Sequence, residues 1–450
     1  MNLVTIAFKS IKQRALASSL TALSVALGVM LMVAVLVIFG ILNRTFGQNA
    51  IFYDLIVGPK GSDLQLVLST VYRVSPPIEN LPYSYYKDLL EHPAVAEAVP
   101  IALGDVTEEG GFPIVGTNER FFELPYAPNE EFLLRGHGFE DPFDAIIGDQ
   151  VAYKNGWDIG SQFKLVHGGQ ESDHVHNEKF TVVGIIKQTG TPNDKTVFIH
   201  LNGFYSIADH NKPVKEYVDR FRKFYTIVPG SDEDLELQEI EEAAAKVAPG
   251  AHYHGPSTDV TKEITSVLVR MKRPAGDPPD APSIAAPLFA SRLKKGFQAQ
   301  GINPIIPMKR LLDNVVGNIQ KGLVVMTTLI IIVSGVSIFV SIYNSMADRR
   351  REIAIMRALG ASRQAVFTII LAESILLCFG GGLFGLLLGH GLVFVAAPIV
   401  ASQTGLLIDP FAFETIEFVI VPSLIVLASI VGFIPGTTAY RTDVAEAIAD

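Results

Sequence analysis

A short polar segment of the chain gathers side chains that could hold a metal ion. Residues 167–178 include three histidines and three carboxylates, and the candidate ligands are His167, Asp173, His174 and His176. Imidazole nitrogens and carboxylate oxygens are donors that Zn²⁺ and Cu²⁺ accept. His174 and His176 alternate, so on a strand their side chains would face the same side. The favoured interpretation of the segment is a solvated polar hairpin tip between two strands, and a zinc or copper site is the alternative.

Familiar catalytic motifs do not occur in this sequence. There is no GxxxxGK(S/T) run to hold nucleotide phosphates and no HExxH run to hold the zinc ion of a metalloprotease. We therefore expect no catalytic residues and no resident cofactor apart from the metal, and we expect ATP hydrolysis on a separate polypeptide. Glu373 is an acid at the end of an apolar run, where acids can relay protons. The favoured interpretation is a carboxylate that pairs with Arg357 or Arg363.

Four long apolar runs provide the frame around these residues. Each has about 20 or more uncharged residues, the length that a helix needs to cross a bilayer. The first is too long for a signal peptide and lacks a small-residue cleavage site. The predicted transmembrane helices are residues 18–42, 322–346, 364–400 and 418–439.

Three glycines recur every fourth residue in the third of these runs, at Gly381, Gly385 and Gly389. Small residues at this spacing allow two helices to approach closely. The stripe predicts helix packing, either at a dimer seam or against another helix of the same chain.

Basic residues near the ends of the runs predict the orientation, because they favour the cytoplasmic side. They precede the first run, lie between the second and third, and follow the fourth, whereas residues 401–417 have none. We expect a cytoplasmic amphipathic helix at 1–17, a cytoplasmic segment at 347–363 and a cytoplasmic tail at 440–450. Residues 43–321 and the short loop 401–417 would then lie outside.

The basic segment 347–363 has the pattern of a helix that ends just before the third span. Ile353, Met356 and Leu359 fall on one apolar face. Gly360 predicts a helix stop, and Ser362 predicts the N-cap of the next helix. A compact elbow of this kind suits the transmission of movement from a cytoplasmic partner. The apolar anchors of that contact would be Ile353, Met356 and Leu359. Glu352 and Arg357 would set its register through charged pairs, and Arg350 and Arg351 are the further coupling residues at its basic end.

The segment 43–321 predicts a large mixed α/β domain. It carries the whole net charge of −10, which argues against nucleic-acid binding. It has no cysteine, since the lone Cys378 lies in the third run, so the domain must depend on its hydrophobic core. Strands are predicted at 95–101, 112–115, 162–166, 180–186 and 196–200, and helices at 83–90, 149–155, 232–247, 261–270 and 308–320. The proline-rich stretch 273–287 predicts a loop.

Several segments resemble one family of membrane proteins. The run RREIAIMRALGAS resembles the signature of the MacB/FtsX/LolC-type permeases, which belong to ABC systems that work by mechanotransmission. IAFKSIKQRALASSLTALSVALGVML resembles the first helix and span of that family, and PGTTAYRTDVAEAIAD resembles its closing motif. AIIGDQVAYKNGWDIGSQFKL with FTVVGIIKQTGTPNDKTVFIHL resembles its extracytoplasmic core domain. The fold expected is an α-helical membrane protein with four transmembrane helices and a large mixed α/β extracytoplasmic domain between the first and second.

The resemblance implies a permease subunit of an ABC transporter in a bacterial inner membrane. A separate ATPase would dock on the elbow, and a second permease, identical or not, would complete a dimer. The external domain would move or extract a lipoprotein, lipid, peptide or small amphipathic molecule, with membrane lipid and a periplasmic adaptor or lipoprotein as further partners. Two alternatives stay open: an FtsX-like transducer that activates a cell-wall hydrolase without transport, and a metal-linked transport system that uses the histidine-rich segment.

Overall fold

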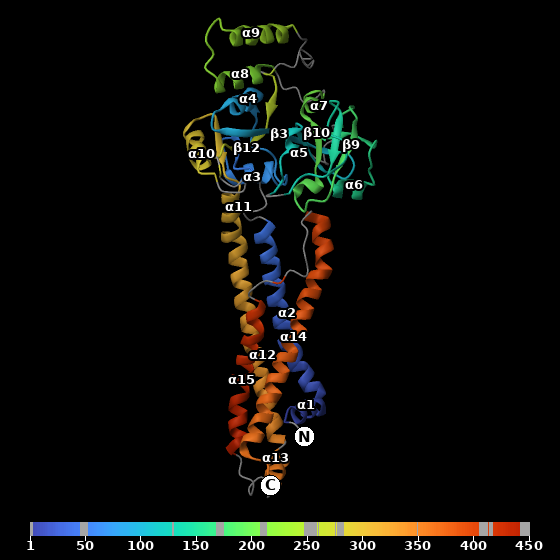
Figure 1. Cartoon of the computed structure of the whole chain (residues 1–450), viewed down its shortest axis with the longest axis vertical. Helices are drawn as coiled ribbons and strands as arrows, with labels where there is room; N and C mark the ends of the chain where they lie inside the picture. Colours follow the sequence, from blue (N-terminus) through green and yellow to red (C-terminus); the bar gives the residue numbers. More distant parts are fainter. Residues whose placement is uncertain are drawn as a thin grey trace. The chain divides into compact units, whose positions relative to one another are not determined.

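The computed structural model describes residues 3–45, 53–127, 130–167, 175–207, 214–246, 259, 261–274, 276, 283–348, 350–404, 413 and 417–441. The chain divides into two compact units (Figure 1). The first, here called the helical unit, comprises Met1–Asn43, Leu312–Gln403 and Ile408–Asp450. The second, here called the α/β unit, comprises Arg44–Leu311 with Thr404–Leu407.

The helical unit is built from long apolar helices. Within the described residues, four helical runs are long and apolar enough to cross a membrane: Ala15–Gly40, Ile305–Asn344, Arg363–Ile399 and Glu417–Thr438. Each overlaps one of the predicted spans over nearly the whole length of that span and ends one or two residues before it. The helices of the unit are α1 (Leu3–Gln13), α2 (Ala15–Thr45), α12 (Gly317–Asp348), α13 (Arg350–Ala358), α14 (Arg363–Thr404) and α15 (Glu417–Arg441).

One apolar core joins these helices. It includes Val29 of α2, Ile338 of α12, Cys378 of α14 and Leu424 of α15, each buried. Before α12, the helix α11 (Ile305–Leu311) and the π-helical turn η4 (Leu312–Val316) follow one another in the chain. The helix predicted at 308–320 is therefore confirmed.

The α/β unit is organised around a mixed sheet of eleven strands in the order β13-β1-β12-β3-β4-β10-β6-β9-β5, with β7 paired to β9 and β8 to β3. The long strand β3 pairs with β12 through its first half and with β4 and β8 through its second half. The strands are β1 (Leu55–Pro59), β3 (Val95–Thr107), β4 (Pro113–Thr117), β5 (Leu134–Gly136), β6 (Asp144–Ile147), β7 (Gln162–Phe163), β8 (Leu165–His167), β9 (Phe180–Ile186), β10 (Val197–His200), β12 (Ser266–Met271) and β13 (Ala299–Ile302).

Short helices flank this sheet (Figure 1). The predicted helices at 83–90, 149–155 and 232–247 are confirmed. A two-stranded sheet pairs β2 (Leu81–Pro82) with β11 (Glu263–Ile264). The helices are α3 (Asp63–Thr70), α4 (Tyr83–Glu91), α5 (Arg120–Glu123), α6 (Asp149–Asn155), η2 (Pro192–Lys195), α7 (Leu201–Tyr205), α8 (Val214–Phe224), α9 (Asp232–Ala245) and α10 (Ala285–Lys295). Of these, α9 packs against α8 and lies away from the strands (Figure 1).

Two sequence-based predictions about this unit are wrong. Residues 261–270 form β11 and most of β12 instead of a helix. Strand β12 lies between β1 and β3 and is buried at five of its six positions, so its apolar residues fill a sheet interior. The proline-rich stretch is not all loop, because α10 begins at Ala285 and accepts Pro287 in its first turn, where a helix needs no N–H donor. Residues 275 and 277–282 of that stretch lie outside the described residues.

Candidate functional site

The segment between α12 and α14 folds into the short helix α13, which ends where the sequence predicts. Gly360 has φ +102°, a conformation that glycine adopts at little cost. Its N–H donates to the carbonyl of Arg357, and the N–H of the next residue donates to the carbonyl of Met356, which closes the helix in a Schellman motif. Ser362 caps α14, because its Oγ accepts from the N–H of Ala365 at 3.1 Å. The predicted stop and cap are confirmed.

The apolar side chains of α13 divide between the bundle and its outside. Ile353 is only 6% exposed and belongs to the core of the helical unit, and Met356 packs against that core. The expectation that Ile353 anchors a partner is therefore wrong, because its side chain is already buried within the chain. Leu359 is 83% exposed and Ile355 is 47% exposed. The outward apolar surface of α13 is therefore made by Leu359, which the sequence predicted, and by Ile355, which it did not.

The charged residues of α13 surround that outward surface. Arg351 and Glu352 are exposed, and Arg357 is partly exposed. The side chain of Arg350 lies outside the described ones. The docking role of these residues stays a prediction.

The glycine stripe of α14 packs against α2 of the same chain. A Cβ at Gly381 would lie 2.7 Å from the carbonyl oxygen of Ala22, and a Cβ at Gly385 would lie 2.6 Å from that of Ala26. A Cβ at Gly389 would lie 2.8 Å from the Cβ of Val33. Of the two predicted roles, packing within the chain is confirmed for this stripe, since α2 already occupies the close approach that the glycines allow.

Part of the predicted metal site comes together in the α/β unit. His167 ends β8, and His176 follows the isolated bridge between Val166 and Val175. Both histidines converge on Asp105 of β3, and one donor atom from each of the three lies within 4.8 Å of the others. The sequence analysis missed Asp105. An acidic residue in the largely apolar strand β3 could have indicated a buried carboxylate with a polar or metal-binding role.

The other two predicted ligands, Asp173 and His174, lie outside the described residues. Their part in a metal site therefore stays a prediction.

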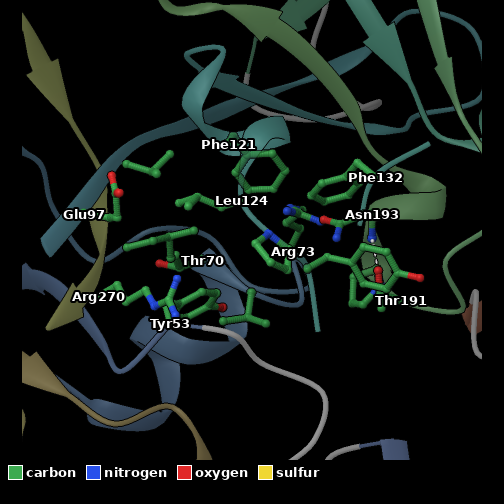
Figure 2. Close-up of a pocket in the computed structure, with 16 residues that line it drawn as sticks. Tyr53, Thr70, Arg73, Glu97, Phe121, Leu124, Phe132, Thr191, Asn193 and Arg270 are labelled. Carbon is green, nitrogen blue, oxygen red and sulfur yellow. Dashed lines mark hydrogen bonds between the residues drawn. The ribbon is translucent and has the colours of Figure 1, made fainter. Parts of the chain in front are cut away.

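A separate cavity of about 80 Å³ lies within the α/β unit (Figure 2). Aromatic side chains make up much of its wall, including Tyr53, Phe121, Tyr126 and Phe132, and two arginines, Arg73 and Arg270, also line it. Figure 2 labels most of these side chains around one space, Tyr53, Phe121, Phe132, Arg73 and Arg270, together with the polar residues Glu97, Thr191 and Asn193.

Arg73 gives this cavity a partly buried positive charge. Its Nη1 donates to Thr196 Oγ1 at 2.9 Å, and its guanidinium lies over the ring of Phe198 at 5.3 Å from the ring centre. Its Nε is buried and has no hydrogen-bond partner among the described residues. Burial disfavours the charged form and lowers the pKa of Arg73 to about 10.

The other ionisable groups that line the cavity do not neutralise the positive charge of Arg73. Glu97 is engaged by Arg120, whose Nε donates to Oε2 at 2.9 Å. Burial, with the nearby Arg273, lowers the pKa of Arg270, and burial raises the pKa of the Tyr53 hydroxyl, which keeps that hydroxyl neutral. Positive charge beside aromatic walls suits an anionic group attached to an apolar body.

Two family models match the chain. The MacB-like periplasmic core domain matches residues 18–260, and the FtsX-like permease C-terminal model matches residues 324–443. The chain belongs to the MacB/FtsX-type ABC permeases. The first match covers the α/β unit as far as residue 260, and the second covers α13, α14 and α15 with most of α12.

Relatives of this MacB/FtsX-type permease span very different fractions of its length. An uncharacterised ABC transporter permease of Methanocaldococcus jannaschii is 23% identical over 97% of this chain and 93% of its own. The macrolide export ATP-binding/permease protein MacB of Burkholderia cenocepacia is 30% identical over 31% of this chain. The matched part spans only 21% of that MacB protein.

Two solved structures are similar to the MacB/FtsX-type permease at low sequence identity. The periplasmic region of MacB from Actinobacillus actinomycetemcomitans has a TM-score of 0.31 and 12% identity, covering 59% of this chain and 95% of that one. The extracellular domain of the ABC-type transporter YknZ from Gram-positive bacteria has a TM-score of 0.27 and 14% identity, covering 56% of this chain and 99% of that one.

Proposed function

We propose that this permease relays the ATP-driven movement of a separate ATPase subunit to its α/β unit, which moves or extracts a substrate. The chain would pair with a second permease in an inner membrane, with its termini and α13 in the cytoplasm. The observation that supports the relay is the construction of α13. One side is fixed in the helical core through Ile353, while Leu359 points outward, so a push on the outer side reaches the bundle.

The closed end of α13 supports the same function. The Schellman motif at Gly360 and the cap at Ser362 leave a turn of only a few residues before α14. A short, hydrogen-bonded turn passes displacement to the next helix with little loss, whereas a long loop would absorb it. An amphipathic helix that presents an apolar residue among charged ones also suits a groove on a protein partner.

The cavity of the α/β unit favours a transported or extracted substrate over pure signal transduction. Its aromatic wall and its arginines suit an amphipathic anion. Among the proposed substrates, a lipid or a small amphipathic molecule would place only its acidic group here, since a cavity of about 80 Å³ is too small for the whole of either. A neighbouring gene for a periplasmic adaptor or lipoprotein would agree with this choice. A neighbouring gene for a cell-wall hydrolase would instead favour the FtsX-like transducer.

The test of the relay is Leu359→Asp, which places a charge on the exposed side of α13. We expect the variant to fold but to lose the ATPase, because a buried charge at the contact costs several kcal/mol. The measurement is the amount of P-loop ATPase that co-purifies with the tagged chain from its own membranes.

Tyr153→Asp is the matched control, since Tyr153 is 87% exposed but lies on α6 of the α/β unit. Equal ATPase recovery with both variants would contradict docking at α13. Met356→Asp is a poorer probe, because it also places a charge against the core of the bundle.

A further inference from the structure

The strand pairing of the α/β unit brings three metal-binding side chains to one place. Asp105 of β3 and His167 of β8 are directly opposite partners in the antiparallel register. On the other side of β8, Val166 bridges Val175, and the N–H of His176 donates to the carbonyl of Leu165. Since opposite residues of neighbouring strands share a face of the sheet, all three side chains meet on the same face.

The distances between the donor atoms are close to those of a metal site. Asp105 Oδ1 lies 3.0 Å from His167 Nδ1, and Asp105 Oδ2 lies 3.7 Å from His176 Nε2. Ligand atoms bound to tetrahedral zinc at 2.0–2.2 Å lie roughly 3.3–3.6 Å from one another. Small movements of side chains therefore suffice to bring the three groups around one ion.

The burial of the three side chains differs in a way that suits an accessible ion. Asp105 and His176 are 3% and 2% exposed, so packing within the α/β unit fixes two of the donors. The His167 side chain is 53% exposed, which leaves a path from solvent to the cluster. Three protein ligands also leave a coordination position for water or for a group of another molecule.

We propose that Asp105, His167 and His176 form a Zn²⁺ site. Two imidazoles and one carboxylate are a donor set that zinc uses in proteins. Mg²⁺ and Ca²⁺ prefer sites made of oxygen ligands, so the imidazoles select against them. The ion would tie Asp105 of β3 to His167 at the end of β8 and to His176. The proposal does not depend on the transport function proposed above.

The experiment is calorimetric titration of the full chain, purified in detergent and freed of metal, with Zn²⁺ alone. We expect one ion per chain. His167→Ala should weaken the affinity by about a hundredfold or more, because loss of even an outer-shell partner costs 10–100-fold. Since His167 is half exposed, this variant leaves the buried core intact. Asp105→Asn and His176→Ala should weaken binding as well, and excess Mg²⁺ should not compete.

The matched control is His200→Ala. His200 Nε2 lies 3.4 Å from Glu119 Oε1, so it forms another histidine–carboxylate pair outside the proposed cluster. This variant should bind Zn²⁺ as the unaltered chain does. Zn²⁺ should also raise the Tm of the unaltered chain and of the control but not that of His167→Ala. The proposal is overturned if the unaltered chain takes up no Zn²⁺, or if His167→Ala and His200→Ala bind it equally.

Discussion

At the scale of single residues, Arg73 is the clearest case of a residue held in a backbone conformation that its Cβ disfavours. It follows the end of α3 at φ +56°, and it is the only non-glycine residue with positive φ in the part of the chain that the structure describes. A helix commonly ends on glycine in this conformation, because a Cβ costs about 1–2 kcal/mol there. The guanidinium that this position sends into the cavity is thus maintained at a cost in backbone energy.

A pair of substitutions separates the backbone from the guanidinium. Arg73→Gly and Arg73→Ala both remove the charge, but only alanine keeps a Cβ. We expect Arg73→Gly to be the more stable by about 1 kcal/mol, the reverse of the order at ordinary positions. The lone tryptophan, Trp157, is 9% exposed in the core of the α/β unit, so its fluorescence reports thermal unfolding of that unit. A higher Tm for Arg73→Ala would show that no strain is present.

The histidine cluster shows what sequence alone can and cannot give at this scale. The density of histidines and carboxylates suggested a metal site near 167–178 as an alternative, and two of the four named residues do come together. Asp105 could not be paired with them, because it lies about 60 positions earlier and only the register of β3 with β8 brings it opposite His167. Similarly, the arginines of the cavity come from positions 73 and 270, which no local pattern connects.

At the scale of elements, local sequence signals predicted where helices begin and end better than they predicted which elements pack against each other. Gly360 and Ser362 fixed the boundaries of α13 and α14 because a helix stop and an N-cap are local chemistry. The face of α13 was misjudged, since periodicity shows that Ile353 and Leu359 differ from their neighbours but not which one the bundle buries. The strand β12 was misjudged for the same reason, because its burial comes from β1 and β3, strands distant in sequence.

The seam between α14 and α2 makes a prediction about packing. Gly385→Ala would place a Cβ 2.6 Å from the carbonyl oxygen of Ala26 and 2.7 Å from the Cβ of Val29. Backbone cannot yield as a side chain does, so we expect a loss of about 1–3 kcal/mol of stability. Cys378 is fully buried in α14, and the temperature at which it reacts with a fluorescent maleimide reports the opening of the bundle.

The control for this substitution is on the same helix. A Cβ at Gly391 meets nothing within 4 Å, so Gly391→Ala should leave the bundle as stable as before or raise its stability by up to about 1 kcal/mol. If Gly385→Ala and Gly391→Ala behave alike, α14 does not depend on a close approach to α2, and the stripe would be free for another helix.

At the scale of the whole molecule, composition along the chain predicted most of the architecture. Length and the absence of charge identified the four spans, because crossing a bilayer imposes both requirements locally. The order of strands in the α/β unit was beyond this reasoning. Strand β1 pairs with β12 and β13, more than 200 positions later, and β10 is parallel to β4 but antiparallel to β6. Such long-range pairing depends on the tertiary packing of the whole hydrophobic core, which no local sequence pattern specifies.

The orientation of the chain gives the last prediction. If basic residues face the cytoplasm, the α/β unit lies outside and α13 lies inside. The chain has only one cysteine, so Cys378→Ser gives a background without thiols in which single cysteines can be placed. Tyr153→Cys and Leu359→Cys introduce thiols at positions that are 87% and 83% exposed. A membrane-impermeant maleimide added to intact spheroplasts should label the first and spare the second. In cells that lack the partner ATPase, both should react once the membrane is permeabilised, and labelling of the Leu359→Cys variant in intact spheroplasts would place α13 outside and rule out a cytoplasmic ATPase at that helix.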